Sequence, residues 1–486
     1  MEKIIPFGEF MPDQPDLNNP GATVATNVYA AATSYKPMPT FAAMPNATLT
    51  GDCLGAGYGK SAAGVGYVFA GDETKLYKFN SSTIAFDDVS IVANYSGTEY
   101  WSFVEYGDTV IACNGINDPI QSFDMGTSTL FANLGGSSPK AKYLAVVRDF
   151  VVAGSVDYGS GHAPDTVGWS ALGDHTDWVI SAATQADSQI IPDAGEVMGV
   201  TGGQYGLVLC RDGVVRMSYV GSPVIFQFDR ISQSKGCMSA GSVAQSNDLT
   251  FFLSDDGFYA CDGNSVIPIG SEKVDRYFFA DVKTDFTDNI RASVDPIRKL
   301  VIWSYPGSGS SGGVNNKLIM YNWQLQRWTT GDDAVAFLSR SISTGVTLDA
   351  LDAVGGLDSL PASLDDPLWA EGNVVLMGFD GNQMGYYTGP PGTAVVETAE
   401  AQISQGQQSK LIEVWPYVDG GTTTIAVADR ALPTDTVTFG DNVSLNGHGF
   451  APVNSTNRFH RMRATITGDW SHAQGLKVVA NPAGRL

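Results

Sequence analysis

A hairpin pattern that recurs seven times is the feature that most constrains how this chain can fold. Each copy is a short run of β-branched or aromatic residues, a turn rich in Gly, Asp or Asn, and a second run with aromatic residues near its end. The paired runs are 65–69 with 76–79, 109–112 with 120–123, 150–153 with 167–169, 207–210 with 215–219, 250–253 with 258–260, 300–303 with 318–321, and 374–377 with 384–387. Because a lone hairpin cannot bury its faces, the pattern predicts small sheets that pack on one another.

The spacing of these hairpins narrows the choice of fold. Measured from the first strand of each copy, the gaps are 42, 41, 57, 43, 50 and 74 residues. Four of the six gaps lie in the range of roughly 40–50 residues that is typical of propeller blades. We therefore predict an all-β chain whose residues 46–395 form a six- or seven-bladed β-propeller-like body. A β-sandwich or meander with chance spacing is the alternative, because the repeats share no signature word.

The largest gap contains an insertion, which we place at residues 341–371. Its Leu-Asp pairs are interrupted by Gly and Pro, so neither a helical nor a strand period persists, and a loop of about 25 residues is expected. We predict that it serves as a gate or a partner contact. The candidate residues are Asp349, Asp352, Leu357, Asp358, Leu360, Asp365 and Asp366. In the alternative, its leucines pack against the neighbouring blade and its aspartates cap turns.

The two ends of the chain differ from the repeats. Residues 410–415, 423–427 and 461–466 alternate like longer strands, so we predict a separate small β domain over 396–486. Residues 1–45 contain seven prolines and should form an extended arm that lies along the C-terminal domain or a neighbouring subunit.

Charge excludes one broad class of function. The chain has 28 Lys and Arg against 51 Asp and Glu, a net charge of −23. Residues 1–400 hold 21 against 45 (net −24), whereas residues 401–486 hold seven against six (net +1). The acidic body repels polyanions, so a general nucleic-acid binder is not expected.

Export and membrane insertion also lack support. No signal-peptide pattern is visible, and no apolar run reaches the ~18 residues of a membrane span. The five cysteines form no metal-binding or paired spacing, which predicts buried reduced thiols.

Motifs for chemistry are weak throughout. Gly59-Lys60-Ser61 resembles the end of a phosphate-binding loop, but Leu54 occupies the position of the required first glycine. Three aspartates around one hairpin, at 255, 256 and 262, could hold calcium or simply form turns. The five histidines show no metal spacing and no catalytic triad context. We therefore predict no catalytic residue, cofactor or metal.

Several segments resemble one family. Residues 7–13 (Phe-Gly-Glu-Phe-Met-Pro-Asp), 16–22, 251–259, 270–276 and 294–296, together with the insertion, are similar to the tail nozzle or tail hub proteins of short-tailed (podovirus-type) bacteriophages. The resemblance covers nearly the full chain.

That resemblance implies a structural virion protein with a β-propeller and a platform-like β domain. Its members form a ring, here a homo-hexamer, below the head-to-tail adaptor protein and continue the DNA ejection channel. The implied location is the virion tail, after synthesis in the bacterial host cytoplasm. Contact with distal tail needle or fibre proteins is expected of the insertion instead, because no motif here matches a needle-binding element of the family. DNA would pass through the lumen without specific binding. The alternatives are a polysaccharide-degrading propeller enzyme and an adhesion module of a phage tail.

Overall fold

All seven predicted hairpins form the two central strands of four-stranded antiparallel units in the computed structural model, which describes residues 1–486 except 17–18, 93, 98, 353–359, 405 and 485–486. The first three units comprise β6 (Gly55–Lys60), β7 (Gly66–Gly71), β8 (Leu76–Asn80) and β9 (Ala85–Asp88); β10 (Ser102–Tyr106), β11 (Thr109–Cys113), β12 (Gln121–Asp124) and β13 (Ala132–Asn133); and β14 (Lys140–Val147), β15 (Phe150–Asp157), β16 (Ala163–Trp169) and β17 (Asp187–Ile190).

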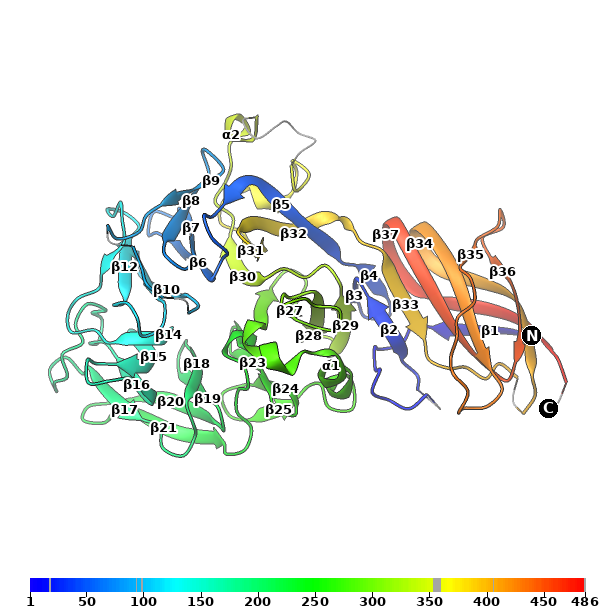
Figure 1. Ribbon diagram of the computed structural model, residues 1–486, viewed down its shortest axis with the longest axis horizontal. Coiled ribbons are helices and arrows are strands. Elements are labelled where there is room, and N and C mark those ends of the chain that lie inside the picture. The colour runs from blue at the N-terminus through cyan, green and yellow to red at the C-terminus, as the bar shows by residue number, and fades with distance from the viewer. Residues whose placement is uncertain (17–18, 93, 98, 353–359, 405, 485–486) are drawn as a thin grey trace.

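The remaining four units follow in chain order around the ring in Figure 1. They comprise β18 (Val197–Thr201), β19 (Gly206–Cys210), β20 (Val214–Gly221) and β21 (Ile225–Ser232); β22 (Ala244–Ser246), β23 (Leu249–Ser254), β24 (Gly257–Cys261) and β25 (Val266–Pro268); β26 (Arg291–Asp295), β27 (Leu300–Tyr305), β28 (Lys317–Asn322) and β29 (Arg327–Gly331); and β30 (Phe337–Ile342), β31 (Val374–Asp380), β32 (Gln383–Pro391) and β5 (Pro39–Thr48).

The units form a propeller. Six of them are separate sheets in the described part of the chain, and β26–β29 occupy a seventh position while remaining joined to the C-terminal sheet. First strands of neighbouring units contact one another, β6 with β10, β10 with β14, β14 with β18, β22 with β26, β26 with β30 and β30 with β6. The all-β class and the six- or seven-bladed propeller are confirmed.

An N-terminal strand closes this ring. β5 pairs antiparallel with β32 as the outer strand of the last blade, with Ala42 opposite Tyr386. The domain boundary expected after residue 45 therefore falls inside β5. The boundary expected after residue 395 falls inside β33 (Ala394–Thr398), which pairs with both the arm and the C-terminal sheet.

The C-terminal sheet is built on two long strands. β34 (Ser409–Arg430) pairs with β37 (Phe459–Pro482) from end to end, beside β35 (Val443–Ser444) and β36 (Ala451–Asn457). The runs 410–415 and 423–427, expected as two strands, are therefore one. Shifts of register between Tyr417 and Thr422, with Gly420 and Gly421 at φ +94° and +66°, let the strand bend. That bend interrupts the alternation of the sequence without ending the strand.

The arm lies along this C-terminal sheet, which is one of the two positions predicted from the sequence. β1 (Glu2–Pro6) pairs with β37, and β2 (Ala22–Thr26) pairs with β33 and β29. β3 (Val28–Ala30) pairs with β4 (Tyr35–Pro37), which touches β37. Both termini consequently lie at the sheet end of the molecule (Figure 1).

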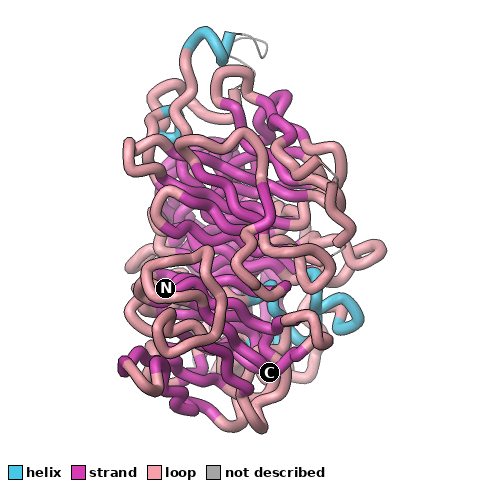
Figure 2. The backbone as a smooth tube through the Cα atoms, turned by 90° about the vertical axis from the view of Figure 1, so that its left-hand side faces the viewer, coloured by secondary structure: helices cyan, strands magenta, loops and turns pink. Residues whose placement is uncertain are grey.

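Helices are short, and strands and loops make up most of the described chain (Figure 2). In the described ranges the α-helices are α1 (Asp275–Asp281) and α2 (Leu348–Asp352). The 3-10 helices that matter below are η1 (Ala240–Ser242), η2 (Thr284–Asn289) and η4 (Pro367–Trp369).

The largest core joins the propeller to the arm and the C-terminal sheet. It contains Phe10 and Tyr35 of the arm, Trp303 and Trp328 of the β26–β29 unit, and Met462 of β37. Large aromatic side chains of this kind supply much of the buried apolar area of a β protein. The five cysteines are all free and buried, as expected for reduced thiols.

Candidate functional site

The insertion leaves the last blade between β30 and β31 and carries α2 beyond the outer edge of the blades (Figure 1). Its root is anchored. Ala350, Leu351 and Leu368 are buried, at 3%, 3% and 4% exposure, in the core between this blade and β6–β9. Leu360 is half-buried and packs against the same core. Leucine packing against the neighbouring blade, the alternative named from the sequence, is therefore present.

The acidic residues of the insertion have two kinds of environment. Asp349 is exposed on α2. Asp365 is exposed and accepts a 2.5 Å hydrogen bond from Ser363 Oγ, which lowers the pKa of its carboxyl. Asp366 accepts the backbone N–H of Leu368 at 2.8 Å and so caps η4.

The structure describes only some of the other residues predicted for the insertion. Asp352 lies in α2, whereas Leu357 and Asp358 lie outside the described residues. Leu364 is 46% exposed. The insertion thus offers exposed carboxylates and an exposed leucine on a loop whose base is packed.

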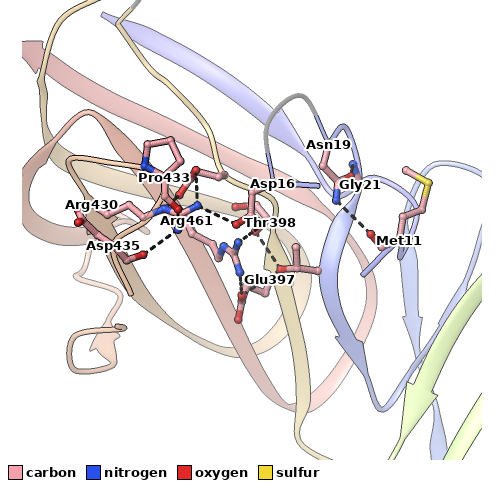
Figure 3. A network of polar contacts seen from close by, with 12 residues as sticks. Met11, Asp16, Asn19, Gly21, Glu397, Thr398, Arg430, Pro433, Asp435 and Arg461 are labelled. Atoms are coloured by element: carbon pink, nitrogen blue, oxygen red, sulfur yellow. Dashed lines mark hydrogen bonds and ion pairs between the residues drawn. The ribbon is translucent and has the colours of Figure 1, made fainter. Parts of the chain in front are cut away.

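A second cluster, which the sequence did not reveal, fastens the arm to the C-terminal sheet (Figure 3). Arg430 Nε donates to Glu400 Oε1 at 2.5 Å and its Nη2 donates to Glu400 Oε2 at 2.9 Å. Asp16 of the arm accepts from Arg430 Nη2 at 2.9 Å and from Arg461 Nη2 at 2.5 Å. We call Asp16, Glu397, Glu400, Arg430 and Arg461 the arm-lock cluster.

The arm-lock cluster is shielded from water and electrically balanced by its neighbours. The side chains of Glu397, Glu400 and Arg430 are 4%, 6% and 8% exposed. Glu397 accepts from Arg461 Nη1 at 3.2 Å and from Arg463 Nη2 at 2.9 Å. Removing one partner of such a group leaves a buried charge unpaired, which costs far more than an exposed pair is worth. The partners lie up to 445 residues apart, so no local spacing could have indicated them.

The aspartates weighed as a calcium site have other partners. Asp255 lies 3.4 Å from Arg211 Nη2, and Asp256 pairs with Lys235. Asp262 accepts the backbone N–H groups of Asn264 and Ser265, which is turn chemistry. Among the residues that the structure describes, no group of three or more His, Cys, Asp or Glu side chains could hold a metal ion.

One histidine lies closer to serines than the sequence suggested. His460 Nε2 is 3.1 Å from Ser409 Oγ, and Nδ1 is 3.2 Å from Ser455 Oγ, which donates to Asp429. However, Nε2 also faces the backbone carbonyl oxygens of Ser409 and Asn457 at 3.1 Å. Because carbonyls only accept, Nε2 carries the proton and is no base for the serine. With Ser409 and His460 fully buried, this group is part of the core.

Comparison with known proteins adds only distant likenesses. No protein-family model and no curated protein matches the sequence. Among solved structures, the chain is similar to the Pan2 WD40 domain of Neurospora crassa, with 7% identity, 59% of this chain and 82% of that chain covered, and a TM-score of 0.36. It is also similar to the extracellular domain of BT4673 from B. thetaiotaomicron, with 10% identity, 91% of this chain and 62% of that chain covered, and a TM-score of 0.39.

Neither likeness bears on activity. The propeller assignment depends on the strand pairing described above.

In the described ranges, none of the helices is both long enough and apolar enough to cross a lipid bilayer.

Proposed function

We propose that the chain is a structural subunit of the tail of a short-tailed bacteriophage, a ring-forming tail nozzle below the head-to-tail adaptor that continues the DNA ejection channel. The observation that carries the proposal is the way the arm joins the two β bodies. One N-terminal segment supplies β1 and β2 to the C-terminal sheet and β5 to the last blade. A subunit that transmits load along a tail needs such continuity, and it agrees with the family resemblance of residues 7–13 and 16–22.

Charge supports a channel role over a binding role. The excess of acidic residues lies before residue 400, and a lumen of that character repels phosphate so that DNA slides without adhering. In this proposal the subunits form a homo-hexamer, no enzymatic step is involved, and the insertion contacts distal tail needle or fibre proteins through its exposed residues, Asp349, Leu364 and Asp365.

Imaging of the purified protein tests the proposal. We expect rings in negative-stain micrographs and a light-scattering mass of six chains, together with density for the protein in the tails of virions. An exclusively monomeric protein that depolymerises bacterial surface polysaccharide would instead support the propeller-enzyme alternative. A monomer that binds such polysaccharide without cleaving it would support the adhesion module.

A DNA-binding measurement tests the charge argument separately. With a fluorescent duplex at about 0.15 M salt, the ring should show no tight binding, since the net charge of −23 per chain repels phosphate. Tight binding with a steep salt dependence would contradict a lumen that lets DNA slide.

A further inference from the structure

The axis of the propeller contains a cavity of about 550 Å³. Its lining comes from the inner ends of the blades, within the segments 99–102, 142–143, 196–198, 240–243, 288–292 and 337–338. A cavity of this size is within the range of small-molecule sites, which combine apolar walls with a few polar groups. Its polar groups therefore indicate what it could bind.

One cation in the lining has unused hydrogen-bonding capacity. Arg291, the first residue of β26, is 5% exposed. Its Nη1 donates to the carbonyl oxygens of Asp288 and Ile290, at 2.8 and 2.6 Å. In the part of the chain that the structure describes, its Nε and Nη2 have no hydrogen-bond partner, and no other arginine there has two such buried nitrogens. Unpaired buried N–H groups are costly, which favours a partner that the chain itself does not supply.

The unpaired edge has a specific shape. Nε and Nη2 form the side of the guanidinium that matches the two oxygens of a carboxylate. The same protein shows this pairing elsewhere, where Arg430 uses its Nε and Nη2 to hold both oxygens of Glu400. Arg291 presents the equivalent edge without a carboxylate.

The surroundings restrict the ligand further. Lys142 is neutralised by Glu99 at 3.1 Å, and the exposed Glu196 and Asp288 would repel a polyanion. Trp101 and Phe337 contribute aromatic surface to the wall. The ring of Tyr100 lies over the guanidinium, its centroid 3.2 Å from Arg291 Cζ, while the residue itself is 39% exposed. Tyr100 therefore covers one face of the guanidinium, and its exposure leaves it solvent into which to turn.

We propose that the axial cavity binds a small molecule with a single carboxylate on an apolar ring, held by Nε and Nη2 of Arg291 after Tyr100 turns aside. The site belongs to the propeller and does not depend on the tail-nozzle proposal.

Calorimetric titration of the full-length protein with benzoate tests the proposal, with benzamide and inorganic phosphate titrated at matched ionic strength. Benzamide has nearly the same shape but no charge, so it should bind at least tenfold more weakly than benzoate. Phosphate should bind no better than benzamide. Equal affinity for benzoate and benzamide, equal affinity for phosphate, or no 1:1 binding of benzoate would overturn the proposal.

The Arg291→Lys variant tests the residue. Lysine keeps the charge but loses the two-pronged edge, so benzoate affinity should fall at least tenfold. Arg276→Lys, at an arginine whose side chain is 68% exposed, is the matched control and should bind as the unaltered protein does. Unchanged benzoate affinity in Arg291→Lys would refute the assignment. If that variant fails to fold, the comparison of benzoate with benzamide still decides the matter.

Discussion

Asp16 Oδ1 lies 2.5 Å from Nη2 of Arg461, although 445 residues separate them in the chain. The contact joins the N-terminal arm to β37, next to the nearly buried pair of Arg430 with Glu400. Because these arginines are shielded from water, they depend on carboxylates from other segments for their stability in the folded state. The arm is therefore an integral part of the C-terminal sheet.

Replacing Asp16 by Asn should loosen the arm. The substitution leaves Arg430 and Arg461 with one carboxylate fewer, and because Asp16 is 36% exposed, the expected loss is about 1–2 kcal/mol. Protease cleavage within residues 1–30 and the melting temperature measure the effect. Asp441→Asn, at an exposed position of the same domain, serves as the control and should change neither. Equal cleavage rates in the two variants would show that the contact does not hold the arm.

The stability of the protein should decline between pH 4 and pH 7 because of Asp275. Burial, with smaller contributions from Asp13 and Asp256, raises the pKa of its carboxyl to about 6, although the N–H of Phe258 partly stabilises the charged form. In the unfolded chain this carboxyl has a pKa of about 3.9, so above pH 4 the unfolded state ionises first and is stabilised relative to the folded state by about 3 kcal/mol at pH 7.

Denaturant unfolding of Asp275→Asn and of the unaltered protein, at several pH values, measures this contribution. The stability of the variant relative to the unaltered protein should increase as the pH rises from 4 to 7. Asp285→Asn, an exposed residue nearby in η2, should track the unaltered protein. A difference between Asp275→Asn and the unaltered protein that is independent of pH would mean that Asp275 ionises normally in the folded state.

Substituting two leucines of the insertion should have different effects on the stability of the fold. Leu351→Ala opens a cavity between the last blade and β6–β9 and should cost about 2–4 kcal/mol. Leu364→Ser, at a 46% exposed position, should stay within about 0.5 kcal/mol. If the insertion docks a distal tail protein, Leu364→Ser should nevertheless impair tail completion. Normal infectivity of phage carrying Leu364→Ser would argue against that contact.

Truncation should separate the arm from the blade that it completes. Removing residues 1–38 deletes β1–β4 but keeps β5, so a protease-resistant propeller should survive, while assembly into the proposed hexamer should fail. Removing residues 1–48 also deletes β5 and the core residues Met44 and Ala47, which exposes the edge of β32. The longer truncation should aggregate. If both truncated proteins yield the same protease-resistant fragment, β5 is not needed to close the propeller.

The sequence by itself determined the hairpins, because their causes are local. Alternating apolar residues and a Gly, Asp or Asn turn select a strand, its partner and their register within about 20 residues, as in β23 and β24 around Asp255 and Asp256. The repeat of these units then implied the propeller, since each small sheet must bury its faces on the next. The acidic character of residues 1–400 likewise follows from the sequence alone, because it is a count of charged residues.

Only the tertiary structure decided which distant segments meet. β5 completes a blade whose other strands begin about 290 residues later, Asp16 meets Arg430 and Arg461, and Arg291 keeps one edge unpaired at the propeller axis. No periodic pattern in the sequence indicates these contacts. Each one requires that a long loop be closed, at a cost in chain entropy, and that water be excluded from polar groups, at a cost in solvation free energy. Only the whole fold determines whether those costs are offset. For the same reason, the sequence predicts two strands at 410–415 and 423–427 where the structure has one, β34. The bend at Gly420 and Gly421 has the composition of a turn, and only the pairing with β37 shows that the strand continues.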